Sequence, residues 1–263
     1  MSTKIQKKDL LLYKNELVDF LRSEVKKAKM NGLIVGISGG IDSAVCALLA
    51  KEAFPHNHLV VEMPCHSDKF DLECSQKLIN MHKLNTTRVD LTSTFDHLKS
   101  NIGTCVTKNF SFNNIKPRLR MTTLYALANE HNYMVVGTDN ACEWFTGYFT
   151  KYGDGGVDIA PIIHLYKSEV YELGKIINVP NEIIDRTPTA GLWPNQTDEK
   201  EMGFSYQELE MYMKNHLVDL SPSTIKKIEA LHQKSEHKRR GIIFPEFSTN
   251  IHVNNDNLTK NSR

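Results

Sequence analysis

One short segment, residues 36–43, constrains the fold more than any other part of the chain. It reads Gly-Ile-Ser-Gly-Gly-Ile-Asp-Ser, follows the apolar run 33–35 and passes directly into an apolar stretch that begins at Ala44. A strand that ends in small residues and turns straight into a helix directs free backbone N–H groups, and the positive end of the helix, at one point. The sequence therefore predicts a strand–loop–helix unit that binds an anion.

The side chains of this segment indicate which anion it binds. Gly39 and Gly40 allow unusual torsions and a close approach to the ligand, while Ser38 and Ser43 add hydroxyl donors. Asp42 is compatible with bound phosphate if a hard cation such as Mg²⁺ lies between them. The segment lacks the lysine and the spacing of G-x-x-x-x-G-K-[ST], which disfavours a Walker-type ATPase or GTPase. It resembles instead the SGGxDS loop of ATP pyrophosphatases, which split ATP between its α and β phosphates.

Length and composition limit the remaining possibilities. The chain has 263 residues, with 32 basic against 31 acidic side chains, so charge gives no reason to expect nucleic acid or a membrane surface as the main partner. No segment reads as an apolar signal or a membrane span. The five cysteines are odd in number and include no C-x-x-C pair, which favours reduced thiols in the cytoplasm and leaves any metal to oxygen ligands.

Strands and helices alternate along the first half of the chain. We expect strands at 33–35, 58–63, 86–91 and 133–137, and helices at 10–29, 68–83 and 116–131, with a helix after the phosphate loop. Nearly continuous apolar strands that alternate with helices indicate an α/β fold, a doubly wound parallel sheet with flanking helices. Ligands of such sheets bind at the carboxyl ends of the strands.

The second half of the chain is less regular. A glycine-rich loop, 147–161, and a second loop, 188–199, are long enough to indicate function. A helix is expected at 166–177 between them, and a mostly helical tail continues to Gln233. The whole chain, 1–263, is expected to form a single domain, with a polar end, 250–263, that frays.

A second carboxylate, Glu143, follows the fourth strand in Gly-Thr-Asp-Asn-Ala-Cys-Glu. The carboxyl ends of parallel strands meet at one edge of a sheet, so Glu143 is expected near Asp42. Together they would form a two-carboxylate Mg²⁺ site that phosphate oxygens complete.

Taken together, the chain resembles the NAD synthetase family from about Val35 to Arg239. The segments that carry the resemblance are 36–43, Asn-Ile-Lys-Pro-Arg-Leu-Arg-Met (114–121), Gly-Thr-Asp-Asn-Ala-Cys-Glu (137–143), Phe-Thr-Lys-Tyr-Gly-Asp-Gly-Gly-Val-Asp (149–158), Pro-Thr-Ala-Gly-Leu-Trp (188–193), Gln-Thr-Asp-Glu (196–199) and His-Lys-Arg (237–239). The resemblance implies the adenine-nucleotide alpha hydrolase-like fold and amidation of deamido-NAD (nicotinic acid adenine dinucleotide) to NAD, with ATP as co-substrate.

The resemblance also implies the roles of individual residues. The ATP-binding positions are Gly36, Ile37, Ser38, Gly39, Gly40, Ile41, Asp42, Ser43, Thr138, Lys167 and Thr189. The deamido-NAD positions are Arg118, Lys151, Asp158, His237 and Lys238. Asp42 and Glu143 would hold Mg²⁺, and Asp42, Glu143 and Lys167 would carry the catalysis, with Lys167 neutralising the departing pyrophosphate.

The chain departs from the family pattern at two places. Gly191 stands where some members have an aspartate, in a shorter loop. The segment 62–66, Glu-Met-Pro-Cys-His, replaces a basic, glycine-containing version. The contacts of the nucleobase are therefore not predicted from the resemblance.

The expected reaction proceeds through an adenylated carboxylate that ammonia then attacks. No glutaminase domain fits before Val35, so we expect the chain to use ammonia directly, and the family implies a homodimer. Two alternatives stay open at this point. One is a tRNA-modifying adenylating or thiolating enzyme, which the neutral charge and the missing C-x-x-C disfavour. The other is a non-catalytic ATP sensor, in which Asp42 and Glu143 would have no role.

Overall fold

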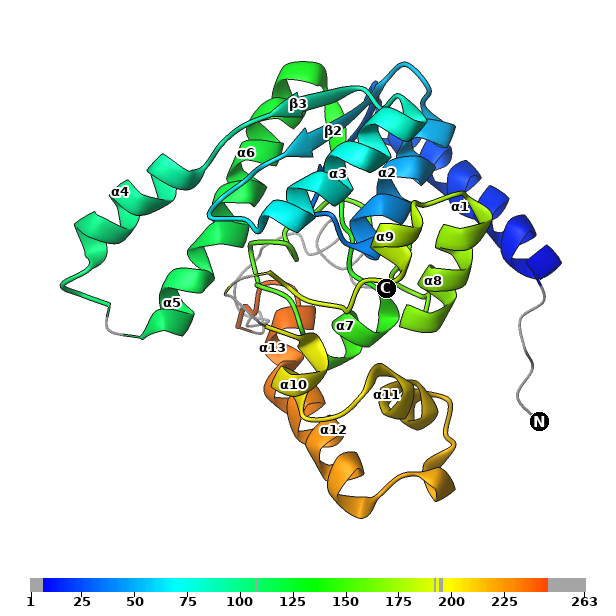
Figure 1. Cartoon of the computed structure of the whole chain (residues 1–263), viewed down its shortest axis with the longest axis vertical. Coiled ribbons are helices and arrows are strands. Elements are labelled where there is room, and N and C mark those ends of the chain that lie inside the picture. Colours follow the sequence, from blue (N-terminus) through cyan, green and yellow to red (C-terminus); the bar gives the residue numbers. More distant parts are fainter. Residues whose placement is uncertain (1–6, 107, 192, 194–195, 246–263) are drawn as a thin grey trace, which may run out of the picture.

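A four-stranded parallel sheet forms the centre of the protein (Figure 1). The computed structural model describes residues 7–106, 108–191, 193 and 196–245, so the expected frayed end at 250–263 lies outside the described residues. The strands are β1 (Gly32–Ile37), β2 (His58–Glu62), β3 (Thr86–Arg88) and β4 (Tyr133–Val136), and they lie in the order β3-β2-β1-β4. Because β2 and β4 flank β1 on opposite sides, the order reverses at β1, which is where a ligand crevice forms in such sheets.

Helices connect and cover these strands. Their bounds are α1 (Lys7–Lys27), α2 (Ile41–Ala53), α3 (Lys69–His82), α4 (Thr92–Ile102), α5 (Asn109–Asn113), α6 (Ile115–His131), α7 (Ala141–Thr146), α8 (Lys167–Ile176), α9 (Asn181–Ile184), α10 (Asp198–Met202), α11 (Tyr206–Met213), the 3₁₀ helix η1 (Leu217–Asp219), α12 (Pro222–Lys234) and α13 (Glu236–Arg239).

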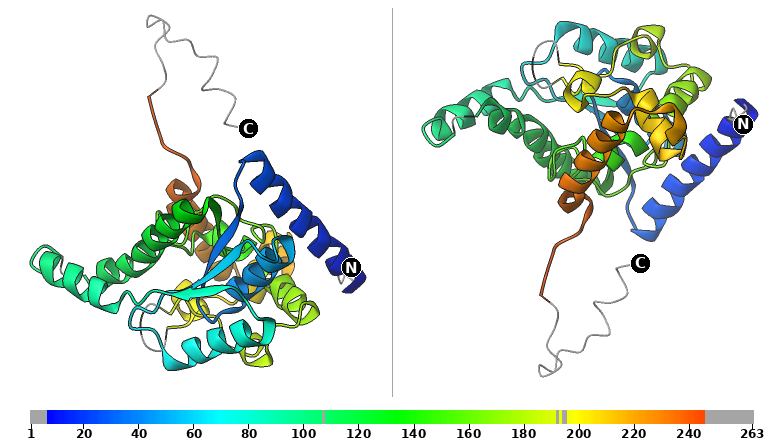
Figure 2. Two further views of the ribbon diagram at one scale, coloured as in Figure 1. Left: turned by 90° about the horizontal axis from the view of Figure 1, so that it is seen from above. Right: turned by 90° about the horizontal axis from the view of Figure 1, so that it is seen from below.

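Both faces of the sheet are buried. Val35 and Val60 are register partners and pack, with side chains of α1, α2, α3 and α8, into one hydrophobic cluster. Ile34 and Val61 point the other way, toward α4 and α6, in a second cluster. Successive residues of a strand face opposite sides, so burial of both sets requires helices on both sides, as the two views in Figure 2 illustrate. The predicted doubly wound α/β fold is confirmed.

A third hydrophobic cluster lies apart from the sheet. It joins α7 to α10, α11 and α12 around the fully buried Leu209 and Ile228, and these last three helices form the lower part of the molecule in Figure 1. This cluster, together with the four helices, is called the satellite cluster below. It positions the start of α7, and therefore Glu143, from the side opposite to the sheet.

Two parts of the fold differ from the sequence expectation. The third strand ends at Arg88 rather than Leu91, because it is an edge strand whose side chains at 86 and 88 are exposed. Helices α4 and α5 were not predicted. They form the arm that extends to the left in Figure 1. In the part of the chain that the structure describes, no helix is long and apolar enough to cross a membrane.

Candidate active site

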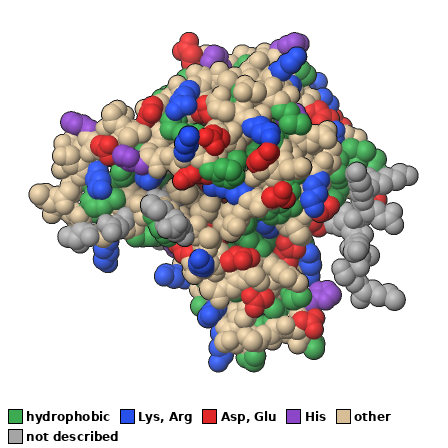
Figure 3. Space-filling view, in the orientation of Figure 1, with side chains coloured by type: hydrophobic (Ala, Val, Ile, Leu, Met, Phe, Trp, Pro, Cys, Tyr) green, Lys and Arg blue, Asp and Glu red, His purple; other side chains and the backbone are tan. Residues whose placement is uncertain are grey.

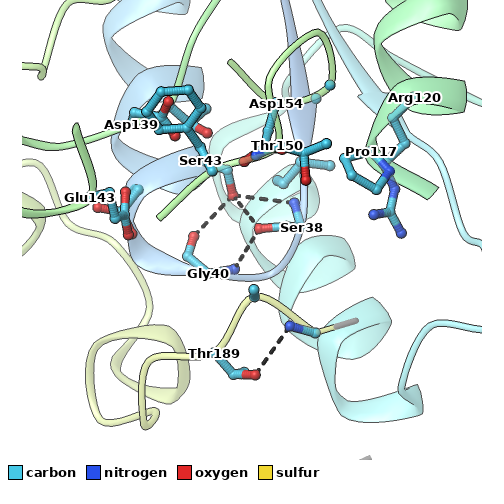
Figure 4. Close-up of a pocket in the computed structure, with 18 of the residues that line it drawn as sticks. Ser38, Gly40, Ser43, Pro117, Arg120, Asp139, Glu143, Thr150, Asp154 and Thr189 are labelled. Carbon is cyan, nitrogen blue, oxygen red and sulfur yellow. Dashed lines mark hydrogen bonds between the residues drawn. The ribbon is translucent and has the colours of Figure 1, made fainter. Parts of the chain in front are cut away.

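A cavity of ≈ 320 Å³ opens at the carboxyl ends of β1, β2 and β4, and Figure 4 shows part of its lining. Its floor is the segment that joins β1 to α2, as the sequence predicted for a phosphate loop. The glycine-rich loop 147–161 and the loop 188–199 both contribute walls, through residues such as Thr150, Asp154 and Thr189. Among the predicted ATP positions, all except Gly39 line this one cavity.

Hydrogen bonds between the loop's own groups fix the conformation of the phosphate loop. The Ser38 and Ser43 hydroxyls lie 3.0 Å apart, Ser43 Oγ donates to the Gly40 carbonyl, and the Gly40 N–H donates to Ser38 Oγ (Figure 4). Gly39 has a φ of +80°, and a Cβ there would lie 2.4 Å from the carbonyl oxygen of Asp71, so only glycine fits. No side chain caps the N-terminus of α2, which leaves its first N–H groups free for an anion.

Beside this loop, one buried lysine bridges the two predicted carboxylates. Lys167 Nζ donates to Asp42 Oδ2 at 2.6 Å and to Glu143 Oε1 at 3.1 Å. Asn140 fixes both acids from the other side, because its amide donates to Asp42 Oδ1 at 2.8 Å and its backbone N–H donates to Glu143 Oε2. The carboxylates come from different helices, α2 and α7, and Asp42 and Glu143 are 101 residues apart in sequence. The sequence expectation that they meet is confirmed by this geometry.

Burial and charge shift the protonation of this cluster. Burial, followed by the neighbouring Asp42 carboxylate, raises the pKa of Glu143 from 4.5 to about 8. Burial alone would lower the pKa of the Lys167 ammonium, but Asp42 and Glu143 outweigh it and hold that pKa above its usual value. Lys167 is therefore a permanent cation at neutral pH.

The donor set at this point fits a hard cation such as Mg²⁺. Asp42 and Glu143 present carboxylate oxygens to one point, and their side chains are only 15% and 13% exposed. Among the residues that the structure describes, no group of three or more His, Cys, Asp and Glu side chains is arranged to hold a metal. Two carboxylates supply only part of the six oxygen ligands that Mg²⁺ requires, so water or phosphate must supply the others.

Three further acids in the cavity were not singled out from the sequence. Asp198 is 3% exposed and accepts from Tyr206 Oη at 2.9 Å, whereas its Oδ1 has no partner. Asp139 is buried and Asp154 faces the cavity, and each lies close enough to Lys238 to be influenced by its charge (Figure 4). Burial raises the pKa of Asp139, and repulsion by the neighbouring carboxylate of Asp154, which is exposed, adds to that shift. All three lie in segments that carry the family resemblance, and this location was the sequence feature that could have identified them.

Two arginines of α6, Arg118 and Arg120, differ in their position relative to the cavity. Arg118 is exposed on α6 and donates to the Lys151 carbonyl at 3.3 Å, outside the cavity lining. Arg120, two residues later, lines the cavity and donates to the Met63 carbonyl through Nε at 3.1 Å (Figure 4). We therefore regard Arg120 as an additional cation of the site.

The remaining predicted deamido-NAD positions divide into two groups. Lys238 lines the cavity, and its Nζ donates to the carbonyls of Gly147 and Phe149. Lys151 and His237 lie outside the lining and are joined, since Lys151 Nζ donates to the His237 carbonyl. Asp158 also lies outside it, and accepts from Tyr125 Oη and the Val135 N–H at 2.8 Å each. The predicted ATP positions thus lie together around the cavity, whereas the predicted deamido-NAD positions extend from the cavity to the surface.

Comparisons with known proteins cover nearly the whole chain. The family model described as NAD synthase matches residues 13–241. The NH(3)-dependent NAD(+) synthetase of Mycoplasmopsis pulmonis is 48% identical over 242 residues, which cover 91% of this chain and 93% of that protein. The solved structure of NMN synthetase from Francisella tularensis superposes with a TM-score of 0.86 at 37% identity, covering 90% of this chain and 99% of that one. The NH3-dependent NAD synthetase from Campylobacter jejuni, solved with nitrate, gives a TM-score of 0.78 at 31% identity, covering 90% and 100%.

Proposed function

The chain belongs to the NAD synthase family, and from that membership we infer that it converts deamido-NAD to NAD with ATP and ammonia, releasing AMP and pyrophosphate. This is the last step of NAD synthesis. One observation supports the inference most strongly. A single cavity contains an open anion-binding loop and, beside it, two carboxylates bridged by a buried lysine.

The chain's own residues account for the first step, in which the nicotinate carboxylate attacks the α-phosphorus of ATP. We propose that the free N–H groups at the start of α2 hold the pyrophosphate, and that Lys167 neutralises the charge that grows on it. Asp42 and Glu143 would hold Mg²⁺, which, when bound, screens the phosphate charge against the attacking carboxylate. Preorganised donors stabilise the transition state because they do not need to reorient during the reaction.

For the second step, we propose that Asp139 and Asp154 bind the incoming ammonium ion. Both are carboxylates of one cavity, so together they attract a small cation. The raised pKa of Asp139 makes it a better proton acceptor than an ordinary carboxylate, and ammonium must lose a proton before it attacks the adenylated carboxylate. Asp158, which the family resemblance assigns to deamido-NAD, lies outside the cavity lining and accepts hydrogen bonds from Tyr125 and the backbone of β4.

Substitution of Asp154 by asparagine is expected to raise the KM for ammonium about tenfold or more and to leave the KM for ATP little changed. The reason is that a neutral amide attracts ammonium weakly and cannot accept its proton. Steady-state kinetics with ammonium and ATP varied separately measures both constants. Asp219→Asn, at an exposed position of η1, is the control and should match the native enzyme. Equal changes in both KM values would contradict the assignment.

Incubation of the protein with ATP, Mg²⁺, deamido-NAD and ammonium is expected to yield NAD, AMP and pyrophosphate in equal amounts, measured by chromatography. A parallel reaction with glutamine at the same low concentration should be slower, because the relatives that the chain matches over nearly their whole length are named NH(3)-dependent NAD(+) synthetases. ADP as the product would exclude the proposed chemistry. Absence of turnover would favour a non-catalytic ATP sensor instead.

The same assay should be repeated with nicotinic acid mononucleotide in place of deamido-NAD. The NMN synthetase of Francisella tularensis superposes with the TM-score given above over nearly its whole length. The corresponding acid, nicotinic acid mononucleotide, carries the same reacting carboxylate and lacks the second nucleotide. A higher kcat/KM for the mononucleotide would make NMN, rather than NAD, the main product.

We also propose that the protein acts as a homodimer in the cytoplasm. The five cysteines are all free, which suits a reducing compartment. Ile242 and Ile243 are 82% and 78% exposed and follow α13, so a second subunit would bury apolar surface there. A tRNA-modifying role is disfavoured by charge, because basic and acidic side chains are interspersed over the face that Figure 3 shows.

A further inference from the structure

Glu62, the last residue of β2, is a buried acid with one unpaired oxygen. The residue is 3% exposed. Its Oε2 accepts from Gln76 Nε2 at 2.6 Å, with Arg88 NH1 4.0 Å away, whereas its Oε1 is buried without a hydrogen-bond partner. A buried polar atom without a partner costs free energy, typically about 1–3 kcal/mol, so such atoms are rare outside functional sites. A bound ligand that donates a hydrogen bond to Oε1 would remove that cost.

The position of Glu62 limits what that partner can be. Glu62 lines the cavity and is the register partner of Ile37, the last residue of β1. Paired strands lie about 4.8 Å apart, so Glu62 lies one strand to the side of the loop. That separation matches the step from a bound phosphate chain to the sugar that carries it. The base would lie further along, beside Met63 and Leu72 of the lining.

The chemistry of a carboxylate narrows the choice to a hydrogen-bond donor. A phosphate group would be repelled by Glu62, whereas a ribose hydroxyl can donate to it. In dinucleotide-binding folds an acid at the end of a strand near the phosphate loop accepts from the ribose in this way. We propose that Glu62 Oε1 accepts a hydrogen bond from a ribose hydroxyl of ATP and selects ribonucleotides. This proposal rests on the ATP site of the proposed function.

The test compares ATP with 2′-deoxy-ATP and 3′-deoxy-ATP in the amidation assay. The native enzyme is expected to prefer ATP over one of the two analogues by about 10- to 100-fold in kcat/KM, as for a hydrogen bond to a charged acceptor. In Glu62→Ala that preference falls to within about threefold of unity, because the acceptor is gone. Glu62→Gln, which keeps a neutral acceptor of the same shape, should give an intermediate preference and supplies the answer if the alanine variant is too unstable to assay.

The preference ratio separates recognition from mere support of the fold. A purely structural role of Glu62 would weaken turnover of ATP and its analogues equally and leave the ratio unchanged, which would overturn the proposal. Val60→Ala is the matched control, because Val60 is buried on the same face of β2 but does not line the cavity. It should lower stability without changing the ratio.

Two other outcomes would also overturn the ribose assignment. One is a native enzyme whose kcat/KM for each of the two deoxy analogues equals its kcat/KM for ATP. The other is a Glu62→Ala variant that loses selectivity only against a triphosphate whose base lacks the 6-amino group, which would place the contact at adenine. If the native enzyme formed neither NAD nor AMP from ATP, the proposed function itself would be wrong. That result differs from the three results above, each of which requires an active native enzyme.

Discussion

Asp42→Asn is expected to reduce the rate of NAD formation by about 100-fold or more while the protein remains folded. Asparagine keeps an oxygen that can accept a hydrogen bond from Asn140, and Lys167 keeps its contact with Glu143. These two interactions should preserve the local structure. The lost charge is the one that we propose holds Mg²⁺ against the triphosphate, and a neutral amide is a weak ligand for that ion.

A binding measurement tests the same substitution independently of activity. In the native protein, Mg²⁺ and ATP together should raise the thermal unfolding midpoint more than ATP alone, since a ligand stabilises the state that binds it. In Asp42→Asn the additional effect of Mg²⁺ should disappear. Asp19→Asn, on the exposed part of α1, serves as the control. Near-native turnover, or an undiminished Mg²⁺ effect, would reject Asp42 as a metal ligand.

Lys167→Met should destabilise the protein by about 3–5 kcal/mol at about pH 8.5, because it leaves two buried carboxylates without their cation. The loss should be smaller at about pH 5.5. The reason is that burial raises the pKa of Glu143 to about 8, so the folded protein binds this proton more tightly than the unfolded chain. The stability that this proton contributes is fully present at low pH and is lost as pH rises through about 8.

Urea unfolding at the two pH values measures the effect. Lys175→Met provides a matched control, since Lys175 lies on the same helix in an exposed pair with Glu172 and such pairs contribute about 0–1 kcal/mol. Without Lys167, Asp42 and Glu143 repel each other strongly once both are ionised. The stability of Lys167→Met should therefore fall more steeply with rising pH than the stability of the native protein. A loss of equal size at both pH values would contradict the cluster's role as a buried charge network.

The parts of the site that lie within one segment could be predicted from the sequence. The 38–43 loop was identified because its glycines, hydroxyls and following apolar residues all serve one local geometry. The meeting of Asp42 with Glu143 could also be predicted, because both follow strands of a parallel sheet and such strand ends share an edge. Lys167 came from the family resemblance, since nothing in its immediate neighbours marks it as buried.

Other features depend on which way a side chain faces, and there the sequence is ambiguous. Arg118 and Arg120 stand two residues apart on α6, which is about 200° around a helix, so one faces the cavity and the other faces away from it. The pattern of apolar residues around them did not decide which. Glu62 likewise reads as the polar end of a strand, and its unpaired oxygen is visible only once α3 brings Gln76 to the other oxygen.

The ion cluster at Lys167 joins parts of the molecule that have separate hydrophobic cores. Asp42 belongs to α2, which packs within the sheet's main core, whereas Glu143 belongs to α7, which packs on the satellite cluster. Tyr206, itself a member of that cluster, adds a 3.5 Å contact to Glu143. Regions with separate cores can open independently, each with its own free energy. We therefore expect nucleotide bound at the proposed catalytic centre to hold these two regions together, so that the lower helices open least often when nucleotide is bound.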